Sequence, residues 1–156
     1  MKALKIITGG QTGVDRAALD VALRHGINCG GWCPAGRLDE FGKIPDRYPV
    51  QELQGASFSE RTFENVKGSD GTVAIYLGEP RGGTEQTIRF CLDLKRPHQL
   101  VDASQVCAEA AAKLIASFVA ENNIGILNIA GPRQSEWPRG YDYASRALSA
   151  FLQHHS

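Results

Sequence analysis

Three glycine-rich segments contain the residue types best suited to bind an anion. "GGQTG" occupies residues 9–13, "RGGTEQT" residues 81–87 and "AGPRQS" residues 130–135. A glycine lets a ligand oxygen approach the backbone N–H groups, and the N-terminus of a helix adds a partial positive charge. If each segment joins a strand to a helix, the three turns can bind a phosphate or a carboxylate without an excess of basic residues.

The glycines of the first segment allow two interpretations. Gly9, Gly10 and Gly13 either make a tight strand-to-helix turn or leave the backbone bare for a ligand. "GGQTGVD" matches neither the G-x-G-x-x-G dinucleotide fingerprint nor the P-loop, which disfavours ordinary NAD and ATP binding. A valine at Gly10 separates the interpretations, because it blocks only the ligand where the backbone is extended but strains the turn where φ is positive.

Side chains next to these glycines extend the candidate site, and each also has an ordinary structural explanation. Thr84 follows Gly82 and Gly83 and is suited to cap a helix. Arg133 can clamp an anion or form a salt bridge at the rim. Asp15 can satisfy the helix dipole or accept hydrogen bonds from N–H or hydroxyl groups of a ligand.

Arg16 is the one contact candidate in a row of charges spaced by four residues. Arg16, Asp20 and Arg24 otherwise resemble an exposed ion-pair row on a helix.

We predict no catalytic residue and no metal site. None of the four histidines adjoins a glycine turn, and Glu85 can serve as a general acid or base or simply decorate a helix start. Cys29 and Cys33 are spaced C-x3-C without a nearby histidine, a weak metal signal. Two further thiols, Cys91 and Cys107, are expected on buried helix faces.

The apolar pattern predicts an α/β fold. Short β-branched runs bounded by Gly, Pro or Asp predict strands within residues 4–10, 27–34, 71–77, 96–102 and 124–131. Helical spacing predicts helices after residue 13, within 61–69, after 83 and around 144–151. A further helix is expected to start at a capping box of Asp102 and Gln105 and to carry an apolar face through residues 107–118. This alternation indicates a Rossmann-like, doubly wound, mainly parallel sheet with helices on both faces, and residues 1–156 form one ligand-binding domain.

Residues 34–57 interrupt this alternation with a long irregular loop rich in proline and charge. Arg37 and Lys43 could reach a ligand's phosphate if the loop closed as a lid, and a plainly solvated loop explains the same composition.

Charge and length exclude several classes of protein. The 156 residues contain 17 basic and 17 acidic side chains, which leaves no field to attract nucleic acid or an anionic membrane. Because no apolar run has the length of a signal peptide core or a membrane span, we expect a cytoplasmic protein.

The motifs together resemble the molybdenum cofactor carrier proteins, Rossmann-like relatives of the "lonely guy" phosphoribohydrolases and the lysine-decarboxylase-like superfamily. The resemblance spans nearly the whole chain and rests on "GGQTGVDRAALD", "GWCPAGR" with "IPDRYP", "RTFENVKGSDGT", "GGT", and "LNIAGPR" with "WP". It implies a homo-oligomer that binds molybdenum cofactor, an anionic pterin, and leaves molybdoenzymes open as protein partners. By similarity, the ligand loops comprise Gly10, Gln11, Thr12 and Gly13, then Gly82, Gly83 and Thr84, then Gly131 and Arg133.

The second glycine turn departs from the hydrolase signature, because Arg81 precedes the glycines and Glu85 directly follows Thr84. The carrier is therefore the leading hypothesis. An N-glycosidic nucleotide hydrolase assisted by Glu85 and a nucleotide-sensing module remain alternatives.

Overall fold

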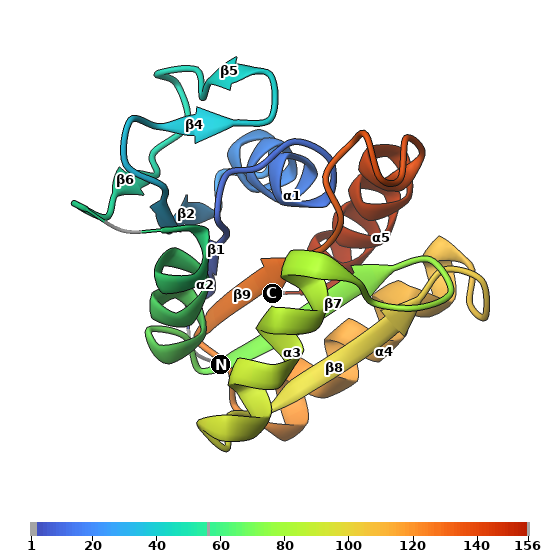
Figure 1. Ribbon diagram of the computed structural model, residues 1–156. Coiled ribbons are helices and arrows are strands. Elements are labelled where there is room, and N and C mark those ends of the chain that lie inside the picture. The colour runs from blue at the N-terminus through green and yellow to red at the C-terminus, as the bar shows by residue number, and fades with distance from the viewer. Residues whose placement is uncertain (1–2, 56, 156) are drawn as a thin grey trace.

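A five-stranded parallel sheet forms the centre of the computed structural model, which describes residues 3–55 and 57–155 (Figure 1). Its strand order is β2-β1-β9-β7-β8. The strands are β1 (Lys5–Ile7), β2 (Asn28–Gly30), β7 (Gly71–Tyr76), β8 (His98–Asp102) and β9 (Ile126–Ala130). All of their pairings are parallel, as the alternation of strands and helices predicts.

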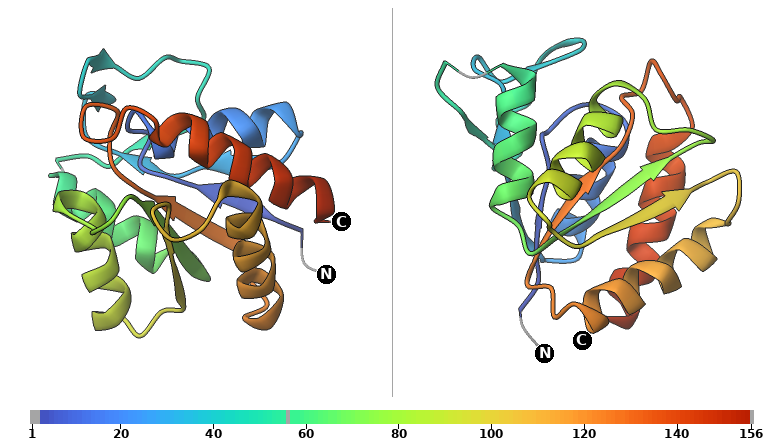
Figure 2. Two further views of the ribbon diagram at one scale, coloured as in Figure 1. Left: turned by 90° about the vertical axis from the view of Figure 1, so that its right-hand side faces the viewer. Right: turned by 60° about the horizontal axis from the view of Figure 1, so that its bottom comes forward.

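Five helices cover the two faces of this sheet (Figure 2). They are α1 (Val14–Arg24), α2 (Phe58–Lys67), α3 (Gly82–Asp93), α4 (Ala108–Glu121) and α5 (Gly140–His154). Helix α5 packs between α1 and α4, whereas α2 packs against α3. Right-handed crossovers explain the two groups, because α1 and α4 lead the chain one way along the sheet and α2 and α3 lead it back. The Rossmann-like α/β prediction is confirmed.

Strand β7 lies in the middle of the core, and all six of its residues are buried. Its neighbour β9 pairs with it and with β1, placing Leu127 opposite Ile6 and Gly71. The predicted face of α5 is buried as expected, at Ala144, Ala147, Leu148 and Phe151. Because the central strands are parallel, their carboxyl ends meet at one edge, where the turns into α1, α3 and α5 gather.

Residues 27–34 form two strands rather than one. Strand β2 ends at Gly30 and β3 (Trp32–Cys33) leaves the main sheet to pair with β6 (Gln51–Glu52). Gly31 has φ of 122°, and a side chain there would overlap the backbone of Thr8. The chain therefore bends at a residue that only glycine can occupy comfortably.

The segment predicted as an irregular loop contains short strands. Between β3 and β6, strands β4 (Leu38–Asp39) and β5 (Gly42–Lys43) form an antiparallel hairpin.

Two predictions about α4 were wrong. Its helix begins at Ala108 and not at Asp102, which ends β8, and Cys107 is the exposed N-cap, whereas Cys91 on α3 is buried as expected. In the described part of the chain, no helix has both the length and the apolar character needed to cross a membrane.

Candidate functional site

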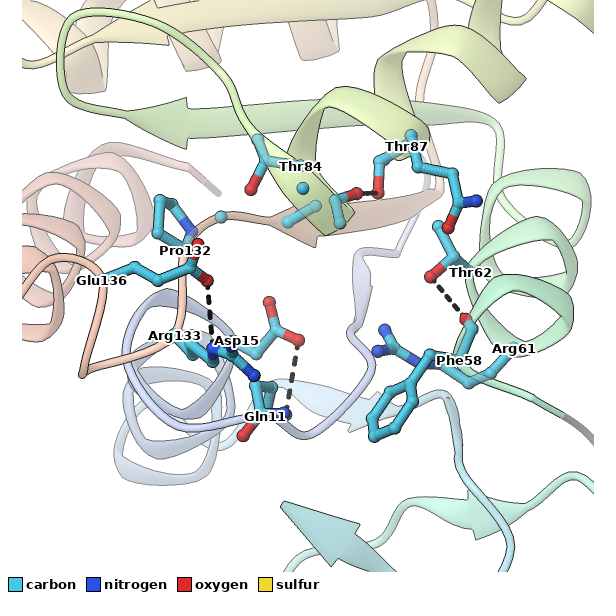
Figure 3. A pocket seen from close by; sticks show the side chains of 15 residues that line it. Gln11, Asp15, Phe58, Arg61, Thr62, Thr84, Thr87, Pro132, Arg133 and Glu136 are labelled. Atoms are coloured by element: carbon cyan, nitrogen blue, oxygen red, sulfur yellow. Dashed lines mark hydrogen bonds and ion pairs between the residues drawn. The ribbon is translucent and has the colours of Figure 1, made fainter. Parts of the chain in front are cut away.

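A pocket of about 230 Å³ lies where the turns after β1, β7 and β9 meet the side of α2 (Figure 3). Its wall includes seven of the thirteen predicted site residues: Gln11, Asp15, Gly82, Gly83, Thr84, Gly131 and Arg133. The structure thus brings all three glycine-rich segments to one place. It adds residues that were not predicted, chiefly Phe58, Arg61 and Thr62 from α2, and Gln86, Thr87, Ala130, Pro132 and Glu136.

The three glycines of the first turn, Gly9, Gly10 and Gly13, do not line the pocket. Gly10 and Gly13 have φ of 76° and 80°. A Cβ at Gly13 would lie 2.6 Å from the carbonyl oxygen of Pro132, and one at Gly9 would overlap the guanidinium of Arg61. These glycines are therefore required by the turn and by close packing, the first of the two interpretations.

The glycines that begin α3 have different surroundings. A Cβ at Gly83 would meet no atom within 4 Å, and one at Gly82 would meet only Glu136 Oε2, at 3.9 Å. No side chain caps this helix. The free backbone N–H groups at its start can therefore receive an anion.

The helix-cap prediction for Thr84 was wrong, because Arg81 is the N-cap and Thr84 lies inside the first turn of α3. The Thr84 side chain is buried in the pocket wall, and its N–H donates to the carbonyl oxygen of Arg81.

Asp15 presents the one buried carboxylate of the pocket wall as the structure describes it. Burial raises the pKa of this carboxyl from 3.8 to about 6. The positive charges of Arg61 and Arg16 and the N–H groups of Gln11 and Gly9 act in the opposite direction. The Gln11 N–H donates to Asp15 Oδ2 over 3.3 Å, which orients the carboxylate at the start of α1.

Arg61 is the principal residue that the sequence reasoning missed. Its guanidinium packs against the backbone of Gly9 and over the Phe58 ring, 5.8 Å from the ring centroid. Burial lowers the pKa of this guanidinium, which the charge of Asp15 opposes. The signal was present in the sequence, because Arg61 lies on the helical stripe that also carries Phe58, Thr62 and the buried Asn65.

Arg133 occupies the rim of the pocket and forms the salt bridge that was its structural alternative. Its Nε lies 3.1 Å from Glu136 Oε1 and 3.9 Å from Glu40 Oε1, and the side chain is half exposed. A ligand would have to compete with these two carboxylates for the guanidinium.

The structure does not bring Arg37 to the pocket. Its guanidinium donates to the carbonyl oxygens of Val50, Pro45 and Tyr48, at 2.7, 2.8 and 3.1 Å. Lys43 is exposed and pairs with Asp46. The arginine thus stabilises the fold of its own loop, and neither side chain lines the pocket.

Glu40, in the loop between β3 and β6, forms hydrogen bonds to the first and third glycine segments. Its carboxylate accepts hydrogen bonds from the hydroxyl of Thr12 and from the N–H of Ser135, and its own N–H donates to Gln11 Oε1 over 2.9 Å. Interactions with Ser135 and Thr12 lower the pKa of this carboxyl against the effect of burial. Thr12 therefore braces the loop instead of facing the pocket.

Arg16 and Asp20, from the predicted ion-pair row on α1, also bind the loop. Arg16 donates to Asp39 Oδ2 over 2.7 Å and to the carbonyl oxygen of Gly10 over 3.0 Å. Asp20 accepts hydrogen bonds from the hydroxyls of Tyr48 and Tyr141, which join α1 to the loop and to α5.

The other candidate groups for chemistry lie elsewhere. Glu85 is exposed, pairs with Arg89 over 3.1 Å and does not line the pocket. The described residues that line the pocket include no histidine or cysteine. Nor do the described residues contain a cluster of three or more His, Cys, Asp or Glu that could hold a metal ion.

Comparisons with known proteins place this arrangement in a family. Residues 6–152 match the model of the circularly permutated YpsA SLOG family. The crystal structure of a putative molybdenum carrier protein from Syntrophus aciditrophicus is 45% identical, with a TM-score of 0.94 over 97% of this chain and 96% of that chain. The search of curated proteins finds no match. The chain belongs to the circularly permutated YpsA SLOG family, and its fold is that of a protein described as a molybdenum carrier.

Proposed function

We propose that this chain binds and carries molybdenum cofactor, with the anionic end of the pterin held in the pocket between α1, α2 and α3. The observation that carries the proposal is the partly buried Arg61 guanidinium in the pocket wall, whose enclosed Nε has no partner among the described residues, beside the uncapped start of α3. Both features favour an oxyanion. The 45% identical relative is named a molybdenum carrier, which supports a ligand that contains molybdenum.

The size of the pocket favours binding of one end of the ligand. Its volume of about 230 Å³ is below the range of about 300–1,000 Å³ that encloses a whole drug-sized molecule. The phosphate of the cofactor would occupy the pocket, and the ring system would extend beyond it past the half-exposed Arg133.

The hydrolase alternative has less support. It relied on Glu85, and that side chain lies outside the pocket. Binding without turnover is therefore the proposal, with molybdoenzymes as candidate recipients and the homo-oligomer as a further expectation.

Co-purification tests the proposal. The chain is purified from matched hosts with and without cofactor synthesis, and molybdenum is measured by elemental analysis and oxidised pterin by fluorescence. We expect molybdenum and pterin to co-purify only with protein from the host that synthesises the cofactor, the competent host. Protein from the competent host that carries neither, or that carries a nucleotide instead, would overturn the carrier function.

A further inference from the structure

Two opposite charges face one another inside the pocket without touching. The Asp15 carboxylate comes from the start of α1 and the Arg61 guanidinium from the middle of α2, and Figure 3 shows them pointing toward one another across the cavity. The described part of the chain shows no ion pair between them, although each affects the pKa of the other. The space between them is open to a ligand group.

We infer that Arg61 and Asp15 form an oxyanion subsite that selects a ligand whose charged group carries, or adjoins, an O–H or N–H donor. The inference rests on the anion pocket of the proposed function and adds the two residues that recognise the ligand's chemistry. Hydrogen phosphate is the simplest ion that has both properties.

Arg61 provides the attraction. A guanidinium has five N–H donors and no acceptor, so a buried one requires oxygen partners. Its buried Nε has none among the described residues, and leaving such a donor unpaired is costly. Opposite it, the start of α3 is uncapped and a side chain at Gly83 would meet open space. An oxyanion between the two would accept hydrogen bonds from the part of the guanidinium that lines the pocket and from the start of α3.

Asp15 provides the selection. An ionised carboxylate only accepts hydrogen bonds, so it repels an oxyanion that has no proton to donate. The charges that face it are Arg61 from α2 and Arg16 from its own helix, with Arg133 and Glu136 farther out at the rim. A ligand donor that reaches Asp15 therefore turns a repulsion into a hydrogen bond, as hydrogen phosphate can and sulfate or molybdate cannot.

Calorimetric titration with inorganic anions tests the subsite. Hydrogen phosphate, sulfate and molybdate are titrated at about pH 8, where an Asp15 carboxyl with a pKa of about 6 is ionised. We expect hydrogen phosphate to bind about tenfold or more tightly than the other two ions. The Asp15→Asn variant should bind all three ions within about threefold of one another, because an amide can donate to an oxyanion.

The Arg61→Met variant tests the attractive half, with Arg89→Met as the matched control. Methionine keeps much of the buried volume and removes the donors, whereas Arg89 is an exposed arginine on α3 that pairs with Glu85. We expect Arg61→Met to weaken every anion about tenfold or more, and Arg89→Met to bind like the parent protein. Thermal melting of each variant identifies any that fail to fold, and Arg61→Gln then replaces Arg61→Met.

The outcomes distinguish this inference from the carrier function. Anion binding that is unchanged in folded Arg61 variants, a preference that persists in Asp15→Asn, or no anion binding by the parent protein would overturn the subsite. Phosphate binding that depends on both residues, in a protein that carries no cofactor from a competent host, would support the subsite and overturn the carrier.

Discussion

The turn that begins α1 and the turn that begins α3 both present glycines near the pocket, but an added side chain would meet different surroundings in the two. At Gly13 it would press on the Pro132 carbonyl, and at Gly9 on Arg61. At Gly83 it would enter open space. The first turn needs glycine so that three segments of the protein can pack closely, whereas at Gly83 of the second turn neither the backbone conformation nor the packing requires glycine.

The difference shows that glycine content alone does not locate an anion site. The first turn is the richer in glycine, yet its contribution to the pocket comes from Gln11 and Asp15. We propose the second turn as the anion site, because no side chain caps α3 and an added side chain at Gly83 would meet open space.

Substitution by alanine should produce the largest difference between the turns. Gly13→Ala places a Cβ in left-handed backbone and 2.6 Å from the Pro132 oxygen, and we expect the free energy of unfolding to fall by about 3 kcal/mol or more. Gly83→Ala, the matched control, should change it by less than about 1 kcal/mol in either direction. Urea unfolding measures both variants. Equal losses would mean that the two turns use glycine for the same reason.

The buried carboxylate of the first turn should make stability depend on pH. With a folded pKa of about 6 against 3.8 unfolded, Asp15 holds its proton more tightly in the folded protein. Its contribution to stability is therefore complete below about pH 4 and is lost as pH rises to about 6, by about 3 kcal/mol.

The difference in unfolding free energy between the parent protein and Asp15→Asn isolates this effect from groups of opposite sign such as Glu40. Between pH 4 and pH 7, we expect the unfolding free energy of Asp15→Asn to rise by about 3 kcal/mol relative to that of the parent protein. A difference that does not vary with pH would mean that Asp15 is solvated in the folded state.

Gly83 in the second turn should matter for the ligand alone, whereas Gly82 beside it has φ of 53° and suits the turn itself. Gly83→Val fills the open space at the start of α3, so hydrogen phosphate should bind about tenfold or more weakly while the melting temperature stays near that of the parent protein. Titration and melting on one sample decide the outcome. If Gly83→Val binds phosphate as tightly as the parent protein, the anion does not bind at the start of α3, and the first turn becomes the better candidate.

The sequence was sufficient to predict the sheet and the convergence of the three turns, because apolar periodicity and parallel topology place those turns at one edge. It could not show which residues of each turn face the pocket. Gly10 and Gln11 are adjacent, and only Gln11 lines the cavity. The helical spacing places Arg61 on one face with Phe58 and Thr62, but α2 follows the long excursion through β3–β6, and no local pattern indicates that this face lies beside the first turn.

Removing the charge of Glu40, which binds the first turn, should give the smallest change in stability. Glu40 accepts hydrogen bonds from Thr12 and Ser135, so Glu40→Gln keeps the shape of the side chain and removes its charge. We expect a loss of about 1–2 kcal/mol, the ordinary value of hydrogen bonds to a charged group, with faster hydrogen exchange confined to the loop around β4 and β5 and to residues 10–13. Glu85→Gln is the matched control, because Glu85 is exposed beside the second turn and pairs only with Arg89 among the described residues. If Glu40→Gln speeds amide hydrogen exchange equally at the start of α3, the two turns are coupled. The distinction between a closely packed first turn and an open second turn would then be wrong.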